Sequence, residues 1–112
     1  MMQTEMHSKI VGISFREEGE DRQLNARALQ PGQRLFWKHE MDNKFDPCAI
    51  KVYADEQMTK ALGYLQRDLA RDLVELMRTR GYKYEIFVKA VTGGGGRTFG
   101  CNIRVVATED VK

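Results

Sequence analysis

The sequence lacks the features that mark membrane and secreted proteins. No run of apolar residues approaches the ~20 that a membrane-spanning helix needs. The N-terminus has no charged segment followed by an apolar stretch, so it shows no signal peptide. Only two cysteines are present, Cys48 and Cys101, and they lie far apart in the chain. These features predict a cytoplasmic protein without a membrane segment, in which both thiols are free and buried in a reducing compartment.

Motifs for catalysis and for cofactor binding are also missing. The two cysteines could form a zinc set with His7 and His39, but the short ligand spacings typical of zinc sites are absent. The glycine run at residues 93–96 is not followed by the Lys-Ser/Thr pair and helix of a nucleotide-binding loop. Ser14 and Cys48 have no nucleophile motif around them. The sequence therefore predicts neither an enzyme nor a bound cofactor.

One catalytic alternative remains open. Asp42 and Asp46 place two carboxylates in one turn, where they could hold a divalent metal of the kind that nucleases use. Metal-dependent hydrolysis normally draws its acids from several elements, and no matching third acid stands out. A metal-dependent nuclease is therefore kept only as an alternative hypothesis.

The charge is distributed unevenly, although the formal net charge is only +2. Residues 16–22 carry four acidic side chains, whereas residues 78–89 carry four cations against one acid and residues 93–104 carry Arg97 and Arg104 and no acid. Such asymmetry permits a basic face for phosphate groups. A solvated surface of mixed charge is the alternative. At 112 residues the chain is long enough for one domain and too short for two.

Hydrophobic periodicity predicts more strand than helix. Strands are expected at residues 8–15, 34–40, 49–54, 61–65, 82–91 and 98–107, a short helix at 23–29, a long helix at 67–80, and loose tails at 1–7 and 108–112. In the long helix Leu69, Leu73 and Leu76 recur at helical spacing, and Gly81 is a natural residue to follow its C-terminus. One long helix is too few for an open parallel sheet, so the fold class is mainly β or α+β.

The most informative segment is residues 42–52. Asp42, Asn43, Asp46 and Pro47 favour a turn, and from Cys48 the pattern changes to the alternation of a buried strand. Polar side chains beside an aromatic ring, on a loop held by a rigid strand, are typical of a ligand-binding edge. The alternative is a solvated connecting loop in which Asp46 bonds its own backbone.

Four aromatic residues fall at the ends of expected elements, where a ring need not be part of the core. They are Phe15, Phe45, Tyr64 and Phe99. Stacking of a base on such a ring contributes roughly 1–3 kcal/mol. A flexible glycine loop followed by Arg97 and Phe99 could close over a nucleic-acid strand. The alternative is that each ring fills one end of a barrel.

Four segments, in this order, resemble the HIRAN domain, a module found in some DNA translocases and in short stand-alone bacterial proteins. They are residues 10–15, 43–52, 62–70 and 84–91, the last followed by the glycine run. The resemblance covers residues 8–107. It implies a small OB-like six-stranded barrel with one long helix and one short helix.

The resemblance also implies capture of a free 3′ end of single-stranded DNA. Rings matching Phe15 and Phe45 enclose the terminal bases, Asp46 meets the 3′ hydroxyl, and Asn43 and Arg67 hold sugar and phosphate. Both rings are tyrosine in the best-known members, and position 14 is basic there rather than serine. The complete set of expected nucleic-acid-binding residues is Phe15, Asn43, Phe45, Asp46, Tyr64, Arg67, Arg97 and Phe99.

A chain of this length with no motor cannot remodel DNA by itself. In a role in DNA repair or processing it would need a separately encoded helicase, translocase or nuclease as a partner. A module that only docks such a partner protein is therefore the main alternative to nucleic-acid binding.

Overall fold

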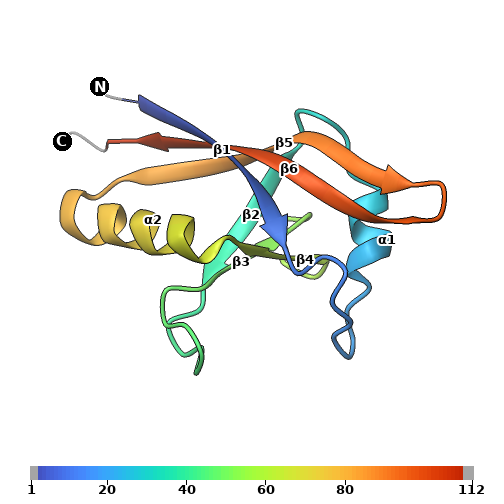
Figure 1. Ribbon diagram of the computed structural model, residues 1–112. Coiled ribbons are helices and arrows are strands. Elements are labelled where there is room, and N and C mark those ends of the chain that lie inside the picture. The colour runs from blue at the N-terminus through green and yellow to red at the C-terminus, as the bar shows by residue number, and fades with distance from the viewer. Residues whose placement is uncertain (1–2, 110–112) are drawn as a thin grey trace.

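The computed structural model describes residues 3–109 and shows a closed antiparallel barrel (Figure 1). Its strands pair in the order β1-β4-β3-β2-β5-β6. In chain order the elements are β1 (Gln3–Val11), α1 (Arg22–Arg27), β2 (Arg34–His39), β3 (Ile50–Tyr53), β4 (Ala61–Leu65), α2 (Arg67–Arg80), β5 (Lys83–Gly94) and β6 (Arg97–Thr108). The predicted OB-like six-stranded barrel with one long and one short helix is confirmed.

The first strand is displaced from its predicted position. Residues 3–7 were expected in a loose tail, but they pair with β6, where Gln3 lies opposite Thr108. The strand ends at Val11 because Gly12 has a positive φ of 81° and begins a turn, in which Phe15 N–H donates to the Gly12 carbonyl. Residues 1–2 and 110–112 of the predicted tails lie outside the described part, whereas Thr108 is the last residue of β6.

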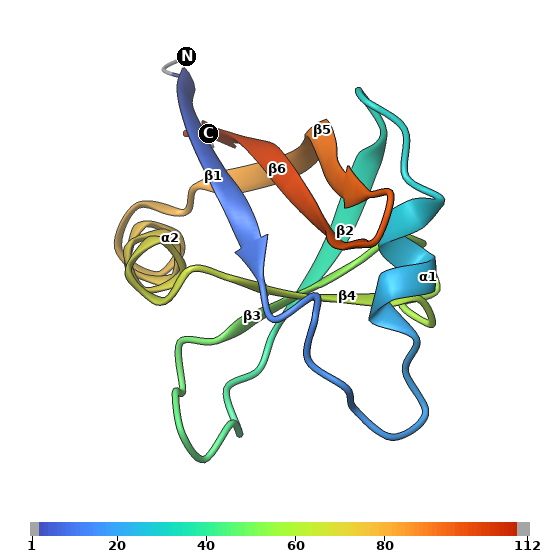
Figure 2. The same ribbon diagram turned by 45° about the vertical axis from the view of Figure 1, so that its right-hand side comes forward.

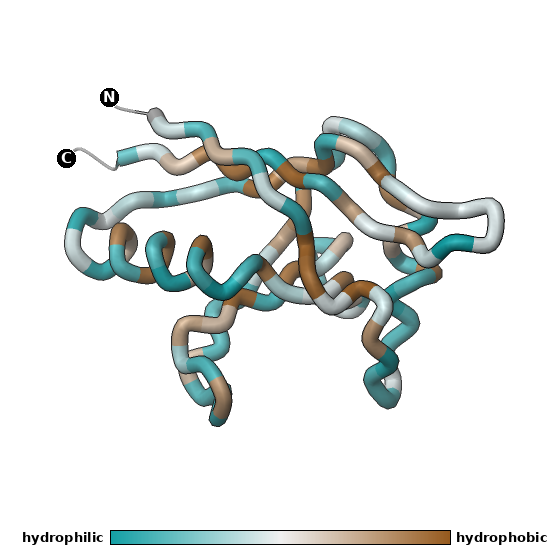
Figure 3. Tube along the Cα trace, viewed as in Figure 1, coloured by the Kyte–Doolittle hydropathy of each residue, from teal (hydrophilic) through white to brown (hydrophobic). Residues whose placement is uncertain are grey.

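The core fills the barrel with side chains from alternate strand positions. On β6 these are Cys101, Ile103 and Val105, as the alternation predicted, and on β5 the buried set includes Ile86. Each fully buried aliphatic side chain contributes about 1.5–3 kcal/mol. Figure 3 shows the hydrophobic segments on the crossing strands and a mostly hydrophilic loop at residues 16–21. The interior is therefore a packed core.

The long helix covers one end of the barrel. Leu73 is fully buried, and Ala70, one turn before it, is buried as well. The helix ends where Gly81 takes a left-handed conformation and its N–H donates to the Met77 carbonyl at 3.1 Å. Both bounds agree with the prediction of 67–80. The first residue, Arg67, is placed at the exit of β4 and close to the loop that follows β2.

The predicted glycine loop is partly strand. Gly93 and Gly94 are the last residues of β5, and the turn itself is Gly95-Gly96, with φ values of 61° and 94°. Two central residues with positive φ are what a tight hairpin turn of the type I′ class requires. A Cβ atom on Gly93 would lie 2.0 Å from the Thr98 carbonyl oxygen, so glycine is needed there for close strand approach.

Candidate nucleic-acid interface

Two loops project from the same end of the barrel (Figures 1 and 2). One is residues 12–21, between β1 and α1, and the other is residues 40–49, between β2 and β3. Each carries an exposed phenylalanine: Phe15 is 61% exposed and Phe45 is 93% exposed. Neither ring fills an end of the barrel, so that alternative is wrong for both. Exposed rings on loops are available to a ligand.

The Asn43 side chain fixes the loop that presents Phe45. Its Oδ1 accepts hydrogen bonds from the backbone N–H groups of Phe45, at 2.9 Å, and Asp46, at 3.0 Å. Its Nδ2 donates to Glu40 Oε1 at 3.1 Å. The loop is therefore ordered by its own Asx turn, and Phe45 is directed into solvent by the backbone rather than by packing.

The two carboxylate oxygens of Asp46 have different partners, and one of them forms the Asx turn that the sequence allowed. Oδ1 accepts from the backbone N–H of Cys48 at 3.0 Å, which forms the Asx turn and delays the start of β3 to Ile50. Oδ2 lies 3.9 Å from Nε of Arg67, whose side chain is highly exposed. Asp46 thus shapes the loop and also presents negative charge next to the first residue of α2.

Tyr64 and Lys51 form the floor between the two loops. They are opposite one another in the β3–β4 pairing, and Lys51 Nζ lies 5.8 Å from the centre of the Tyr64 ring. The Tyr64 hydroxyl donates to Glu40 Oε1 at 2.9 Å, the same oxygen that binds Asn43. Burial and this bond to Glu40 both raise the pKa of Tyr64, so the hydroxyl stays neutral.

A buried arginine connects this floor to the other loop. Arg22 is only 5% exposed, and its guanidinium carbon lies 5.8 Å from the ring centres of both Phe15 and Tyr64. Its Nη1 donates to the Gly12 carbonyl at 3.0 Å, and its Nε donates to Glu20 at 2.8 Å. The guanidinium thereby holds the base of the Phe15 loop against β4.

Glu20 completes the arrangement by bridging two cations. One carboxylate oxygen accepts from Arg22, and the other accepts from Lys51 Nζ at 2.5 Å. Burial alone would raise the pKa of Glu20, but the hydrogen bonds and charges of Lys51 and Arg22 outweigh it and hold that pKa below its usual value. Lys51 and Arg22 therefore share one carboxylate as their partner, whereas the Arg67 side chain beside them is highly exposed.

Six of the eight predicted site residues belong to this one end of the barrel. They are Phe15, Asn43, Phe45, Asp46, Tyr64 and Arg67. The structure connects them through Arg22 and Glu40, which sequence reasoning missed, as it also missed Glu20 and Lys51. The only local signal was the cluster of opposite charges at residues 16–22, and its partner Lys51 is 31 positions from Glu20.

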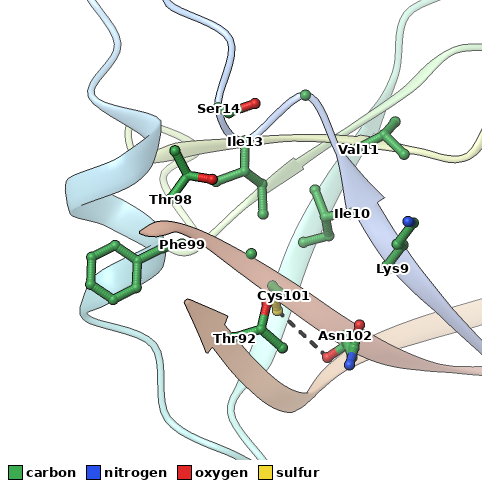
Figure 4. Close-up of a pocket in the computed structure, with 12 residues that line it drawn as sticks. Lys9, Ile10, Val11, Ile13, Ser14, Thr92, Thr98, Phe99, Cys101 and Asn102 are labelled. Carbon is green, nitrogen blue, oxygen red and sulfur yellow. Dashed lines mark hydrogen bonds between the residues drawn. The ribbon is translucent and has the colours of Figure 1, made fainter. Parts of the chain in front are cut away.

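The other two predicted residues, Arg97 and Phe99, lie at the β5–β6 hairpin. They border a separate hollow of about 360 Å³ whose other walls include Leu24 and Arg27. Phe99 is held through its backbone, because the Gln23 side chain accepts from its N–H at 2.6 Å and donates to its carbonyl at 3.0 Å. In Figure 4 the Phe99 ring points toward α1, away from Ser14 and Lys9.

A wedge opens where β1 leaves β6 (Figure 4). Their last paired residues are Lys9 and Asn102, and beyond them lies a cavity of about 400 Å³ that Ser14 and Thr98 also line. Cys101 borders it, and burial raises the pKa of its thiol to about 11. The thiol is therefore protonated at neutral pH. The wedge offers backbone and neutral groups beside the Phe15 loop, with Lys9 as a cation at its rim.

Within residues 3–109, no group of three His, Cys, Asp or Glu side chains is placed to hold a metal ion. The zinc set considered from the sequence is therefore not assembled. Asp42 and Asp46 share their turn without a third such ligand in the described residues. In the same part of the chain, no helix is both long and apolar enough to cross a membrane.

Comparison with known proteins identifies relatives of this barrel. The sequence model of the HIRAN domain family matches residues 4–108. A crystal structure of a protein from Lactobacillus plantarum is similar, with a TM-score of 0.71 at 19% identity, covering 97% of this chain and 100% of that one. The HIRAN domain of human HLTF has a TM-score of 0.65 at 17% identity, covering 92% of this chain and 74% of that one. No curated protein matches the chain in sequence.

Proposed function

The chain belongs to the HIRAN domain family of DNA-binding modules, and we propose that it binds single-stranded DNA at a free 3′ end without catalysing a reaction. The observation that carries the proposal is the pair of exposed phenylalanines on two loops at one end of the barrel, with Asp46 and Arg67 beside them. Rings, a cation and an acceptor are the groups that bases, a phosphate and a terminal hydroxyl require.

The rings supply sequence-tolerant affinity. Every base has a π face, so stacking on Phe15 and Phe45 does not depend on sequence and contributes roughly 1–3 kcal/mol per base. Tyr64 lies between the loops and is held by Glu40 and Arg22, which favours it as a rigid support for a base or a sugar. Rings that are already ordered lose little entropy on binding.

The start of α2 supplies the phosphate contact. Arg67 is its first residue and is 78% exposed, and the first N–H groups of any helix have no partner within the helix. A hollow of about 390 Å³, bordered by Val11 and Gln66, lies at this helix end. A phosphate placed there would meet the guanidinium and the positive end of the helix dipole.

Asp46 supplies selection for the end of the strand. A carboxylate repels a phosphate group, but it is a strong acceptor for a neutral hydroxyl. Oδ1 is committed to Cys48, so Oδ2, on the side of Arg67, is the oxygen that accepts from the 3′ hydroxyl. A strand that ends in phosphate, or a circle without an end, lacks this donor.

Fluorescence anisotropy with labelled oligonucleotides tests the proposal. We expect 3′-hydroxyl strands to bind, 3′-phosphate strands and circular strands to bind poorly, and the affinity to fall with rising salt, as it does for phosphate binders. Equal binding of all three ligands would refute end capture. A parallel incubation with Mg²⁺ or Mn²⁺ should leave the strands intact, and cleavage would show that the module is a nuclease.

Docking of a partner protein is the second candidate, and Met41 favours it. Met41 is 74% exposed in the same loop as Phe45, so this loop presents two large apolar side chains. Such a pair also fits a pocket on a helicase, translocase or nuclease. Protein docking through this loop would be lost with Met41→Ala, whereas base stacking would not.

A further inference from the structure

We propose that the outer face of β1, β6, β5 and β2 is a second contact surface for the nucleic acid, which takes the part of the strand that leads away from the captured end. The inference rests on the proposed function for its first contact point, but the surface itself is defined by other residues. None of them belongs to the two loops.

The surface is built on a row of residues in register across four strands. His7 of β1 lies opposite Arg104 of β6, Arg104 lies opposite Phe87 of β5, and Phe87 lies opposite Arg34 of β2. They point outward because the alternate positions Ile103, Val105, Ile86, Val88 and Leu35 are buried in the core. At about 4.8 Å per strand the row is about 14 Å long. Figure 1 shows β1, β6 and β5 side by side.

Two arginines of this face lie over phenylalanine rings. The guanidinium carbon of Arg104 is 4.9 Å from the centre of the Phe87 ring, and that of Arg34 is 5.4 Å from the centre of the Phe36 ring. A planar guanidinium supported by a ring can stack on a base while its N–H groups meet phosphate oxygens. Repeated cation and aromatic pairs are the composition that single-strand binding surfaces use.

The face also carries excess positive charge. Lys9, Lys38 and Lys89 are exposed on it in addition to the two arginines, and its acids are Glu5 and Glu85. Arg104 lies 3.8 Å from Glu5 and Arg34 lies 3.5 Å from Glu85, and all four side chains are substantially exposed. Such exposed pairs are weak, so a phosphate can replace the carboxylate at little cost. The cations outnumber the acids, and this complements a polyanion.

The surface is continuous with the candidate site. Tyr64 lies opposite Lys51, and Lys51 lies opposite Lys38 of β2. Lys38, Phe36 and Arg34 then follow along the outward side of β2 for about 13 Å at 3.3 Å per residue. From Lys38 to His7 this path is about 27 Å long, which is the length of about eight nucleotides when the strand is stacked at a rise of about 3.4 Å each. A strand held at the loops therefore reaches the face without leaving the protein.

The test compares short and long 3′-hydroxyl oligonucleotides of about four and about fifteen nucleotides, because only the longer exceeds the eight-nucleotide path. The variant is Arg34→Gln with Arg104→Gln. Its matched control is Arg78→Gln with Arg80→Gln, which removes the same charge from exposed positions in the last turn of α2. Anisotropy titrations over a range of salt concentrations give the affinity and the slope of log K against log salt.

We expect the wild-type chain to bind the longer strand more tightly and with a steeper slope. The double variant should lose that gain, and its slope should fall by about 0.7 for each phosphate contact removed. Binding of the short strand should not change, and the control variant should behave as wild type. A second variant, Lys9→Gln with Lys38→Gln, should act in the same direction as the first.

The outcomes separate this inference from the proposed function. Equal loss in the variant and the control, or no loss in either, overturns the outer-face surface and leaves end capture intact. Failure of the wild-type chain to bind short strands, with long-strand binding still sensitive to Arg34 and Arg104, overturns end capture and supports the surface. Retention of long-strand binding in both the lysine and the arginine variant shows that the strand does not use this face and overturns the inference.

Discussion

At the scale of single residues, the two exposed phenylalanines are held in different ways. Phe15 lies near the buried guanidinium of Arg22, which also contacts Tyr64. Phe45 is directed outward by the backbone of a loop that Asn43 organises. Their substitution should therefore have the same effect on binding but different effects on folding.

For Phe45→Ala we expect a loss of roughly 1–3 kcal/mol in single-strand binding, because one stacking surface is removed. Its free energy of unfolding should change by less than about 0.5 kcal/mol, as for other surface positions. Phe15→Ala should weaken single-strand binding by a similar amount. It should also lower the free energy of unfolding, because the contact between the Phe15 ring and Arg22 is lost. Met41→Ala is the control for the loop and should leave strand binding unchanged. Anisotropy and urea denaturation measure the two quantities, and unfolding by Phe45→Ala would show that the ring has a structural role.

Asp46 allows its two roles to be separated by a pair of substitutions. Asp46→Asn keeps an oxygen that can accept from Cys48 N–H but removes the charge, whereas Asp46→Ala removes both. We expect Asp46→Ala to lower stability by about 0.5–1.5 kcal/mol, the value of one hydrogen bond, and Asp46→Asn to lower it much less.

The same two substitutions should also change binding, and their effects should differ between 3′-hydroxyl and 3′-phosphate ends. A hydrogen bond to a charged group contributes about 1.5–3 kcal/mol, so Asp46→Ala should weaken 3′-hydroxyl binding roughly ten- to a hundredfold. Asp46→Asn should weaken it less and should bind 3′-phosphate ends better than wild type does, because the repulsion is gone. Titrations with both kinds of end check this. If the wild-type protein binds 3′-hydroxyl and 3′-phosphate ends equally, the role of Asp46 is confined to forming the Asx turn with Cys48.

Sequence reasoning found the exposed residues of the candidate site more readily than the buried residues that support them. Asn43 and Asp46 belong to a turn whose chemistry is local, and Phe45 is placed by that turn. Arg22 and Glu20 act through Gly12 and Lys51, and only the closed barrel brings these groups together. A contact between distant positions leaves no mark on the local pattern, so these residues could not be found from spacing.

At the scale of elements, accuracy followed the strength of the local signal. The bounds of α2 and β4 were predicted to the residue, because an apolar helical stripe and Gly81 define the helix and a short apolar run defines the strand. The start of β1 was missed, because residues 3–7 include polar side chains and are held as a strand by pairing with β6. Strand formation there depends on a partner about a hundred positions away.

The β5–β6 hairpin gives a prediction that separates its glycines. In Gly93→Ala a methyl group would lie 2.0 Å from the Thr98 carbonyl oxygen at a φ of 90°, so we expect a loss of at least 1–3 kcal/mol of stability, the usual cost of such strain. Gly95→Asn is the matched substitution, because its φ is 61°, no atom lies within 4 Å, and asparagine tolerates this conformation. Chemical denaturation compares the two. Equal losses of stability in the two variants would mean that the conformation of the hairpin turn, and not the close approach of Gly93 to Thr98, determines the cost of substitution.

At the scale of the whole molecule, barrel closure is what brings the parts of the candidate site together. The loop at residues 12–21 follows β1, and the loop at residues 40–49 joins β2 and β3, neither of which is a neighbour of β1. The strand order β1-β4-β3-β2-β5-β6 brings the two loops to one end of the barrel. Alternating segments and a single long helix predicted the fold class, and the family resemblance supplied the barrel. Neither supplied this strand order, because many orders bury the same alternating faces.

Barrel closure also brings the Glu20 carboxylate, in the loop at residues 12–21, next to Lys51 of β3. This contact makes the stability of the fold depend on pH. The pKa of Glu20 is lowered in the folded chain, so the Glu20 bridge stabilises the fold above the unfolded-state pKa, about 4.3, and this contribution is lost as the pH falls through the lowered value. Glu20→Gln should reduce stability at pH 7 by roughly 1–3 kcal/mol, because Arg22 and Lys51 lose a charged partner. The difference from wild type should shrink below about pH 4.3.

The same substitution should move DNA binding in the opposite direction. Without the Glu20 charge, Lys51 loses its carboxylate partner and can attract a phosphate, so Glu20→Gln should bind single strands more tightly at neutral pH and with a steeper salt dependence, by about 0.7 for one added contact. Glu18→Gln is the matched control, because it removes the same charge from an exposed position of the same loop. Thermal unfolding and anisotropy on both variants measure the two effects. A Glu20→Gln protein that is less stable and also binds more weakly would show that Glu20 acts only by shaping the loop, and that the floor cations do not meet the nucleic acid.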